Sequence, residues 1–166
     1  MNIQMTAIGL AQLQAAWLAA PELTTRALLA EMTAITVHLQ GEVQDAMPAV
    51  SGLTRASIAQ DAFSTPAGVL GVVGSPAPAA LFVELGTKPH MPPVSALISW
   101  VQERLGVSAQ DAKRVAFLVA RKIARKGTDP QRIFAKTLDA NEAFIARQFD
   151  GMAARLAQHL QGGVAV

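Results

Sequence analysis

The first half of the chain opens with hydrophobic residues spaced as on an amphipathic helix. From Pro21 to Pro48, apolar residues recur at intervals of three and four positions, which indicates one helical face. They are Leu28, Met32, Ile35, Leu39, Val43 and Met47. Proline is favoured in the first turn of a helix and disfavours helix in the residue before it, so we expect a helix that begins near Pro21 and ends before Pro48. A shorter helix with Leu10, Leu13 and Trp17 on one side is expected before it.

Residues 50 to 76 break this pattern with closely spaced Gly and Pro. Two runs in this segment, SIAQDAF and GVLGVV, are too short for independent helices and predict a hairpin or a small antiparallel sheet. The run AALFVEL at residues 79 to 85 is either a third strand or a helical turn, because periodicity does not separate the two at this length.

Two more helices are predicted between residues 94 and 127. The segment VSALISWVQERLG gathers its large apolar side chains and stops at Gly106, a residue type that ends helices. The next helix is expected to begin after Ser108, a typical N-cap, and to end at Gly127. The apolar residues on its expected inner face are Ala112, Val115, Ala116, Val119 and Ile123.

A last helix is expected to start at Asp129 and Pro130, which combine an N-cap with a first-turn proline. Helical apolar spacing continues from Phe134 to Leu160, so this is expected to be the longest helix. The end of the chain has no capping or periodic signal, and we expect a flexible tail over residues 161–166. Residues 1–160 are enough for one domain with one core.

The composition favours helices that pack closely through small side chains, because alanine is abundant and aromatic residues make up only 5%. Absence of cysteine excludes thiolate nucleophiles and cysteine-ligated metal sites. The apolar stretch from Ile8 to Ala20 is short and interrupted by Gln12 and Gln14, so we expect neither a signal sequence nor a membrane partner.

The residues able to carry chemistry are scattered. His38, His90 and His159 are far apart, and we expect them to be solvated or capping side chains. The twelve carboxylates form no recognisable pair, and the chain has neither a Gly-x-Ser-x-Gly elbow nor a phosphate-binding glycine loop. We therefore expect no enzyme, no cofactor and no bound metal.

Positive charge is concentrated in one region. Eight of the fourteen cationic residues lie between Lys113 and Lys136, against the single acid Asp129, although the net charge of the chain is only +2. The six in the helix spread over the side opposite Val119 and Ile123. The cations are either a solvated surface or a contact for DNA phosphates or an acidic protein. A nucleic-acid-binding module using the basic helix 113–126 is thus an alternative function, with the main contacts expected from Arg121, Lys122, Arg125 and Lys126.

Two segments share the pattern Gly-Thr-x-Pro: VELGTKP at residues 83 to 89 and ARKGTDP at residues 124 to 130. Glycine supplies a positive φ, threonine a hydroxyl for capping, and proline ends the preceding structure, so both segments predict chain reversals. The candidate interface or turn residues are Glu84, Gly86, Thr87, Pro89, Gly127, Thr128, Pro130 and Phe134.

In their order along the chain, these segments resemble the phage tail-completion family, the head–tail joining or minor tail proteins in the neck of long-tailed phages. The order is a helix, SGLTRAS, glycine-rich strands, FVELGTKPH, ARKIARKGTDP and a final helix, and the similarity runs from about Leu23 to Ile145. The family often has a Tyr-rich stretch before Val-Glu and Pro-Phe-Leu after the second Gly-Thr. This chain has AALF and QRIF there, so Phe82 and Phe134 are the candidates for those roles.

The resemblance implies an α+β, helix-rich fold, in which long N-terminal and C-terminal amphipathic helices pack on a small antiparallel β-sheet. It implies a structural virion protein without catalysis, assembled in the bacterial host cytoplasm into the neck of the particle. The expected assembly is a homo-oligomeric ring, a hexamer to match a tail tube or a dodecamer to match a portal. Its expected partners are the connector or portal on one side and a tail-tube or terminator protein on the other, with DNA passing through the lumen. The Gly86–Pro93 loop and the Gly127–Pro130 turn are expected near subunit contacts.

Overall fold

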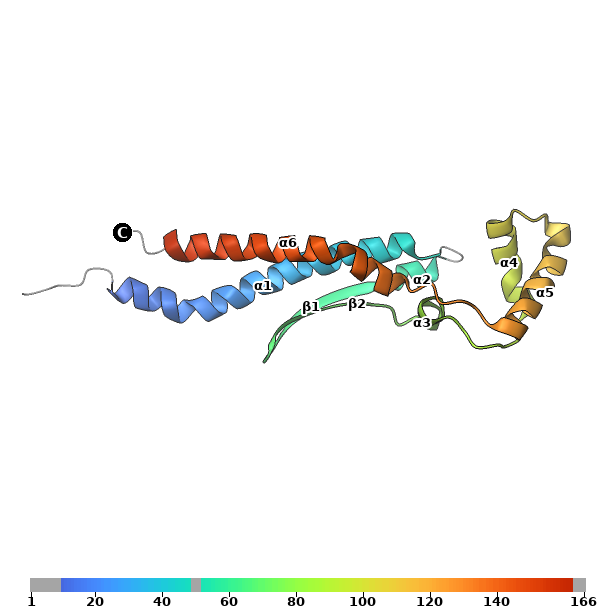
Figure 1. Cartoon of the computed structure of the whole chain (residues 1–166), viewed down its shortest axis with the longest axis horizontal. Helices are drawn as coiled ribbons and strands as arrows, with labels where there is room; N and C mark the ends of the chain where they lie inside the picture. Colours follow the sequence, from blue (N-terminus) through green and yellow to red (C-terminus); the bar gives the residue numbers. More distant parts are fainter. Residues whose placement is uncertain (1–9, 49–51, 163–166) are drawn as a thin grey trace, which may run out of the picture. The chain divides into compact units, whose positions relative to one another are not determined.

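A computed structural model describes residues 10–48 and 52–162, and the side chains of residues 20–48 and 52–159. Helices predominate, and the two strands form one antiparallel hairpin, which confirms the helix-rich α+β class (Figure 1). The elements are α1 (Leu10–Ala46), α2 (Leu53–Ala56), β1 (Ala59–Thr65), β2 (Gly68–Gly74), α3 (Pro78–Leu85), α4 (Val94–Leu105), α5 (Ala109–Lys126) and α6 (Ile133–Gly162).

The chain divides into two compact units. Helices α1 and α6 each contribute one part to unit 1 and the other part to unit 2. Unit 1 comprises the chain up to Leu39, Gln60–Val73 and the chain from Ala140 onwards. Unit 2 comprises Gln40–Ala59 and Gly74–Asp139. A single domain over residues 1–160 stays a prediction. None of the helices in the described ranges is both long and apolar enough to cross a membrane.

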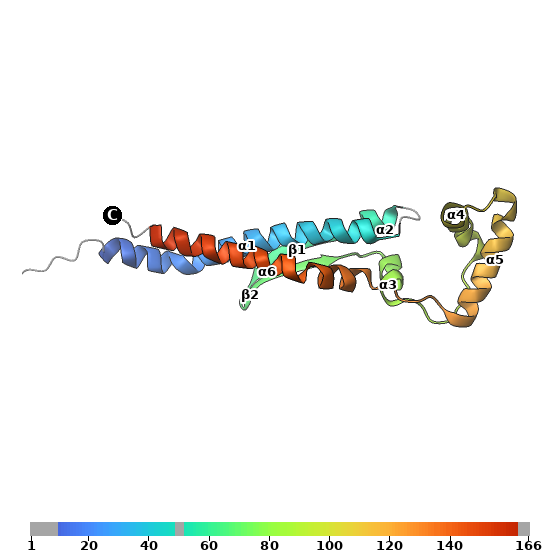
Figure 2. The same cartoon turned by 45° about the horizontal axis from the view of Figure 1, so that its top comes forward.

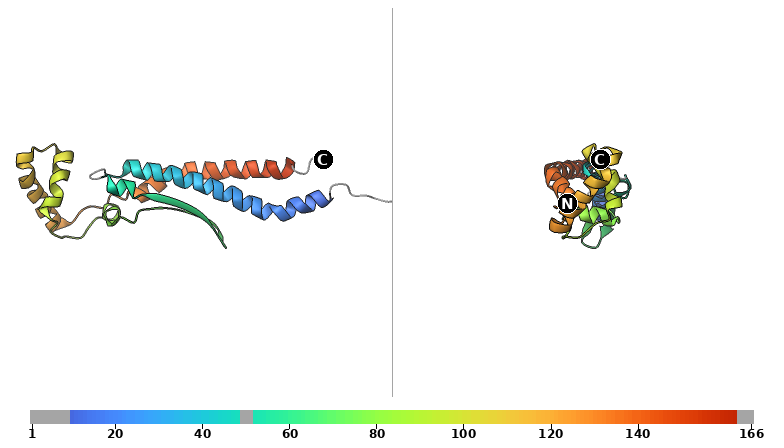
Figure 3. Two further views of the ribbon diagram at one scale, coloured as in Figure 1. Left: turned by 180° about the vertical axis from the view of Figure 1, so that it is seen from behind. Right: turned by 90° about the vertical axis from the view of Figure 1, so that its right-hand side faces the viewer.

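Helix α1 is continuous over 37 residues and contains Pro21 in its interior. The prediction of two helices divided at Pro21 is therefore wrong, and α1 is longer than the 30-residue α6 that we expected to be the longest. A proline inside a helix removes one backbone hydrogen bond, and the ribbon of α1 bends within its N-terminal third (Figures 1 and 3). The hydroxyl of Thr24 donates to the Ala20 carbonyl at 2.7 Å, one turn back. The side chains of Leu10, Leu13 and Trp17 lie outside the part whose side chains are described.

In unit 1, the predicted stripe on α1 faces a buried core that includes Ile35. The β-hairpin lies against α1: the buried Thr36 hydroxyl donates to Gln60 Oε1 at 2.7 Å. On β2, a side chain at Gly71 would overlap atoms of Met32 and Thr36, so glycine permits this close approach. Figure 2 shows β1 and β2 side by side, as predicted from their glycine-punctuated sequences.

The two long helices also meet in unit 1, where they run antiparallel (Figures 1 and 3). Arg155 donates to Glu31 at 2.7 Å. His38 Nε2 donates to Asn141 Oδ1 at 3.0 Å, and the His38 ring lies with its centroid 4.3 Å from that of Phe144. His38, an expected solvated or capping residue, is exposed and bridges the two helices.

In unit 2, the C-terminal part of α1 holds the start of the hairpin. The side-chain amides of Gln40 and Gln44 both donate to the carbonyl of Ile58, at 2.8 and 3.1 Å. Ile58 is buried together with Val43 and Met47, the last two residues of the predicted apolar stripe. The ambiguous run at residues 79 to 85 is helical and forms most of α3.

Helices α4 and α5 form a hairpin whose boundaries were predicted correctly. Gly106 ends α4 in the left-handed conformation (φ 62°). The Ser108 side chain caps α5 by accepting from Asp111 N at 3.3 Å, and α5 ends at Gly127. The residues of the hairpin with no solvent exposure are Val101, Ala112, Ala116 and Ala120. Small alanine side chains on α5 allow the close packing that the composition indicates.

The end of α6 differs from the expected tail boundary. The helix continues to Gly162, so Gln161 and Gly162 are helical. The rest of the expected tail, residues 163–166, lies outside the described residues.

Candidate assembly motif and basic helix

The two Gly-Thr-x-Pro segments pair with each other. Thr87 N donates to the Thr128 carbonyl and Thr128 N donates to the Thr87 carbonyl, each at 3.1 Å, which forms an isolated antiparallel bridge. The two threonine hydroxyls lie 3.0 Å apart and form a third hydrogen bond. The expected capping role of these hydroxyls is therefore replaced by a bond between them. The bridge joins the chain before α4 to the chain after α5.

Gly86 and Gly127 permit this bridge, and both have the positive φ that the sequence predicted, 71° and 72°. Their ψ angles, −174° and −156°, place them in a backbone region that is essentially restricted to glycine. A Cβ on Gly86 would collide with the backbone of Thr128, and a Cβ on Gly127 would collide with the carbonyl of Thr87. Each glycine thus makes room for the threonine of the other segment.

Glu84 caps the start of α6 from the preceding segment. Its carboxylate accepts hydrogen bonds from Phe134 N at 2.9 Å and Ala135 N at 3.2 Å. A carboxylate at this position accepts from backbone N–H groups that have no partner within the helix, and its negative charge interacts favourably with the positive end of the helix dipole. The carbonyls of Val83 and Glu84 also accept from Gln131 N and Arg132 N.

The prediction that Asp129 and Pro130 begin the last helix is wrong, because α6 begins at Ile133. Residues 128 to 130 instead run alongside the Gly86 segment. The positive φ of Arg132, 54°, separates this extended stretch from the helix. Sequence reasoning assigned the cap to the nearest suitable residue, whereas Glu84 supplies it from 50 positions away.

The structure therefore brings most of the predicted turn residues into one cluster, which we call the Gly-Thr clasp. It consists of Glu84, Gly86, Thr87, Gly127, Thr128, Pro130 and Phe134. Pro89 is exposed in the loop that leads away from the clasp. There His90 Nδ1 donates to the Lys88 carbonyl at 2.9 Å. The expectation that these residues lie near contacts with other subunits stays a prediction.

Apolar side chains are exposed on α3, immediately before the clasp. Leu81 and Phe82 are adjacent, and Leu85 follows Phe82 by three positions, so all three lie on one side of the helix. More than half of the surface of each residue is exposed to solvent. Phe82 was predicted only as a substitute for an aromatic residue of the family, and the exposed apolar surface was not predicted, because residues 79 to 85 could form either a strand or a helix. Helical spacing alone would have placed the three side chains on one face.

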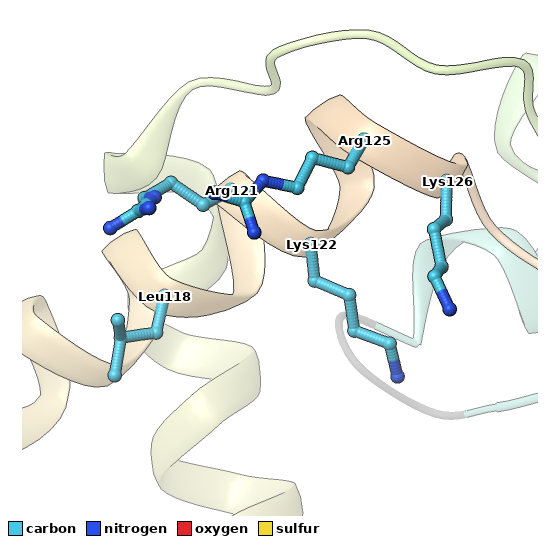
Figure 4. A pocket seen from close by; sticks show the side chains of 5 residues that line it. All are labelled: Leu118, Arg121, Lys122, Arg125 and Lys126. Atoms are coloured by element: carbon cyan, nitrogen blue, oxygen red, sulfur yellow. The ribbon is translucent and has the colours of Figure 1, made fainter.

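The cations of α5 are exposed, as the helical wheel predicted. Arg121, Lys122, Arg125 and Lys126 line a shallow open depression together with Leu118 (Figure 4). In Figure 4 the side chains of Lys122 and Lys126 extend in the same direction from the helix. Among the described residues, no salt bridge involves any of these four cations.

The described residues contain no group of three or more His, Asp or Glu side chains that is suited to a metal ion. His38 and His90 each bond to a neighbouring oxygen, and His159 is exposed in the last turn of α6.

Comparison with known proteins returned no match to a family model, to a curated protein or to a solved structure.

Proposed function

We propose that this protein is a structural component of a phage neck, which joins or completes the tail at the head–tail interface as part of an oligomeric ring. The proposal rests on the ordered segments that resemble the tail-completion family. In the proposed assembly, a hexameric or dodecameric ring contacts the portal side and the tail-tube or terminator side. No catalytic role is part of the proposal.

One observation supports it most strongly: the two Gly-Thr-x-Pro segments that carry the resemblance form one physical unit. Two unrelated turns have no reason to meet, whereas these two exchange hydrogen bonds through equivalent residues, Thr87 and Thr128. Each segment also supplies the glycine that the other requires. The two segments that carry the resemblance thus form a single structural feature.

Exposed apolar surface gives the proposal a second support. Leu81, Phe82 and Leu85 lie on α3 directly beside the clasp, where the resemblance places subunit contacts. Burial of such side chains between subunits of a ring would stabilise the assembly by about 25 cal/mol for each Å² removed from water.

A deletion of the gene in a phage or prophage that carries it tests the proposal. We expect DNA-filled heads and separate tails in electron micrographs, and a loss of infectious particles that wild-type protein supplied in trans restores. Normal yields of joined particles from the deletion would refute the role. Density for this chain at the head–tail junction of an intact virion would also give the copy number.

A matched pair of complementing variants links the phenotype to the structure. Phe82→Ser with Leu85→Ser removes apolar surface from α3 and should leave heads and tails unjoined. Leu53→Ser with Leu138→Ser also removes two exposed apolar side chains, outside α3, and should complement normally. Equal complementation by both pairs would exclude α3 as a subunit contact.

A further inference from the structure

The solvent-facing side of α5 is a continuous stripe of residues that repeats every four positions. It consists of the pairs Lys113 and Arg114, Phe117 and Leu118, Arg121 and Lys122, and Arg125 and Lys126. All eight side chains are exposed, and in the described part of the chain no acid forms an ion pair with any of the six cations. We call these eight residues the basic stripe.

The basic stripe winds gradually around α5, because residues four positions apart are offset by about 40° on an α-helix, and it is held in place. It spans about 20 Å at the rise of an α-helix. The opposite side of α5 is fixed by packing on α4, through Ala112, Ala116 and Ala120, which have no solvent exposure. Six cations without an ion pair in the described part of the chain are therefore presented by a rigid support on the exposed side of α5, with Phe117 and Leu118 among them. Their mutual repulsion is relieved when a polyanion lies along them.

The first polyanion to consider is an anionic membrane. A helix that binds a membrane surface inserts its apolar face among the lipids. On α5 that face is buried against α4, and only Phe117 and Leu118 remain exposed within the basic stripe. The structure thus disfavours lipid as the ligand.

The second is an acidic protein surface. Protein interfaces are depleted in lysine at their centres, and they use few, well-placed charges surrounded by apolar contacts. The basic stripe instead has three lysines among its six cations. The depressions beside it, one next to Arg121 and Lys122 and one next to Phe117 and Leu118, are both open. Backbone phosphates of nucleic acids are contacted by both lysine and arginine, mostly without deep pockets.

We propose that the basic stripe binds the phosphate backbone of duplex DNA without reading its sequence. A single exposed aromatic residue, Phe117, is too few for the successive stacking that single strands require. Between Lys113 and Lys126 there is no amide side chain to read adenine, so the only base-specific contacts open to the stripe are those of its arginines and lysines with guanine. The binding goes beyond the proposed role in a phage neck and does not depend on it.

Fluorescence anisotropy of the full-length protein with a labelled 20-base-pair duplex tests the proposal. For six phosphate contacts we expect log K to fall with log salt at a slope of about −5, which is about a thousandfold loss of affinity between 50 and 200 mM salt. Two duplexes of unrelated sequence should bind equally. Absence of binding at 50 mM salt, or a strong preference for one sequence, would overturn the proposal.

Matched variants locate the site. Arg121→Gln with Arg125→Gln removes two contacts and should make the slope shallower by about 2. Arg104→Gln with Arg147→Gln removes two exposed cations outside the basic stripe and should leave the slope unchanged. Equal effects of the two pairs would show that net charge, and not the stripe, controls binding. Arg121→Lys with Arg125→Lys should retain the slope, which separates lost charge from lost structure.

Competition distinguishes the polyanions. The competitors are compared by their concentration of negative charges. Unlabelled duplex should displace the labelled duplex at a lower such concentration than polyglutamate or phosphatidylserine vesicles require. Displacement by polyglutamate at equal or lower charge would assign the stripe to an acidic protein, and displacement by vesicles would assign it to a membrane. Because the assay uses purified protein, its failure leaves the deletion phenotype of the phage unaffected, and the converse also holds.

Discussion

Thr87 and Thr128 exchange two backbone hydrogen bonds of 3.1 Å, although 41 positions separate them in the chain. The pairing makes both connections of the α4–α5 hairpin pass through one point. Its stability depends on the glycine that precedes each threonine, because a side chain on either would enter the space of the other segment.

Substitution of Gly127 by alanine should strongly destabilise the protein. The new Cβ would collide with the Thr87 carbonyl, and alanine is strained at this φ and ψ by about 1–3 kcal/mol before any collision is counted. Gly106→Ala is the matched control, since Gly106 also has a positive φ but open space around it. Urea unfolding should show a loss for Gly127→Ala that exceeds that of Gly106→Ala by at least about 1 kcal/mol. Equal losses of stability for Gly127→Ala and Gly106→Ala would mean that the bridged segments move apart to accept the new side chain without a loss of stability.

Removal of the threonine hydroxyls should matter far less. Thr87→Val and Thr128→Val keep both backbone hydrogen bonds and lose only the contact between hydroxyls, which is largely exposed. Each variant should lose less than about 1 kcal/mol, and the double-mutant cycle should give a coupling of similar size. A coupling of several kcal/mol would show that the hydroxyl pair, and not the backbone, holds the clasp.

Glu84→Ala should cost about 1 kcal/mol of stability, because α6 loses a cap that accepts from two backbone N–H groups. Glu84→Gln keeps one accepting oxygen but removes the charge beside the helix dipole, so its loss should be smaller. Glu103→Ala on α4 removes an exposed carboxylate that caps no helix and serves as the control. The comparison uses free energies from denaturant unfolding at low ionic strength, and indistinguishable values for Glu84→Ala and Glu103→Ala would exclude the capping role.

Gly71→Ala should destabilise unit 1 by about 1–3 kcal/mol, because the added methyl group overlaps Met32 and the buried Thr36. The flexible Met32 side chain can move, so Gly71→Ala combined with Met32→Ala should recover part of the loss. Gly74→Ala, at the end of the same strand, meets nothing within 4 Å and should be close to neutral. Thermal unfolding followed by circular dichroism measures all three, and a neutral Gly71→Ala would contradict the close packing of β2 on α1.

The elements that were predicted correctly depend on local signals. Gly106, Ser108 and Gly127 act on their own turns of helix, and neighbouring residues are enough to infer their roles. The apolar stripe of α1 is similarly local, because its period of three and four residues survives in any helix that buries one face.

The errors arose where distant contacts override local preference. Pro21 is an exception to this: a proline inside a helix costs about 3 kcal/mol, and α1 continues through it all the same. Asp129 has the side chain of an N-cap, but the pairing of Thr128 with Thr87 holds that segment extended and passes the capping role to Glu84. The repetition of Gly-Thr-x-Pro was visible in the sequence, but no local sequence pattern predicts that the two copies pair with each other.

Because of the bridge, we expect the region between the two motifs to tolerate changes in length and charge. Since the chain leaves at Thr87 and returns at Thr128, its immediate hydrogen-bonded partner, the intervening segment adds no span that the remainder must accommodate. A longer, shorter or differently charged helical hairpin can replace α4 and α5 while Glu84 and Ile133 keep their places. The clasp therefore closes α4 and α5 into an excursion of the chain that begins and ends at the same place.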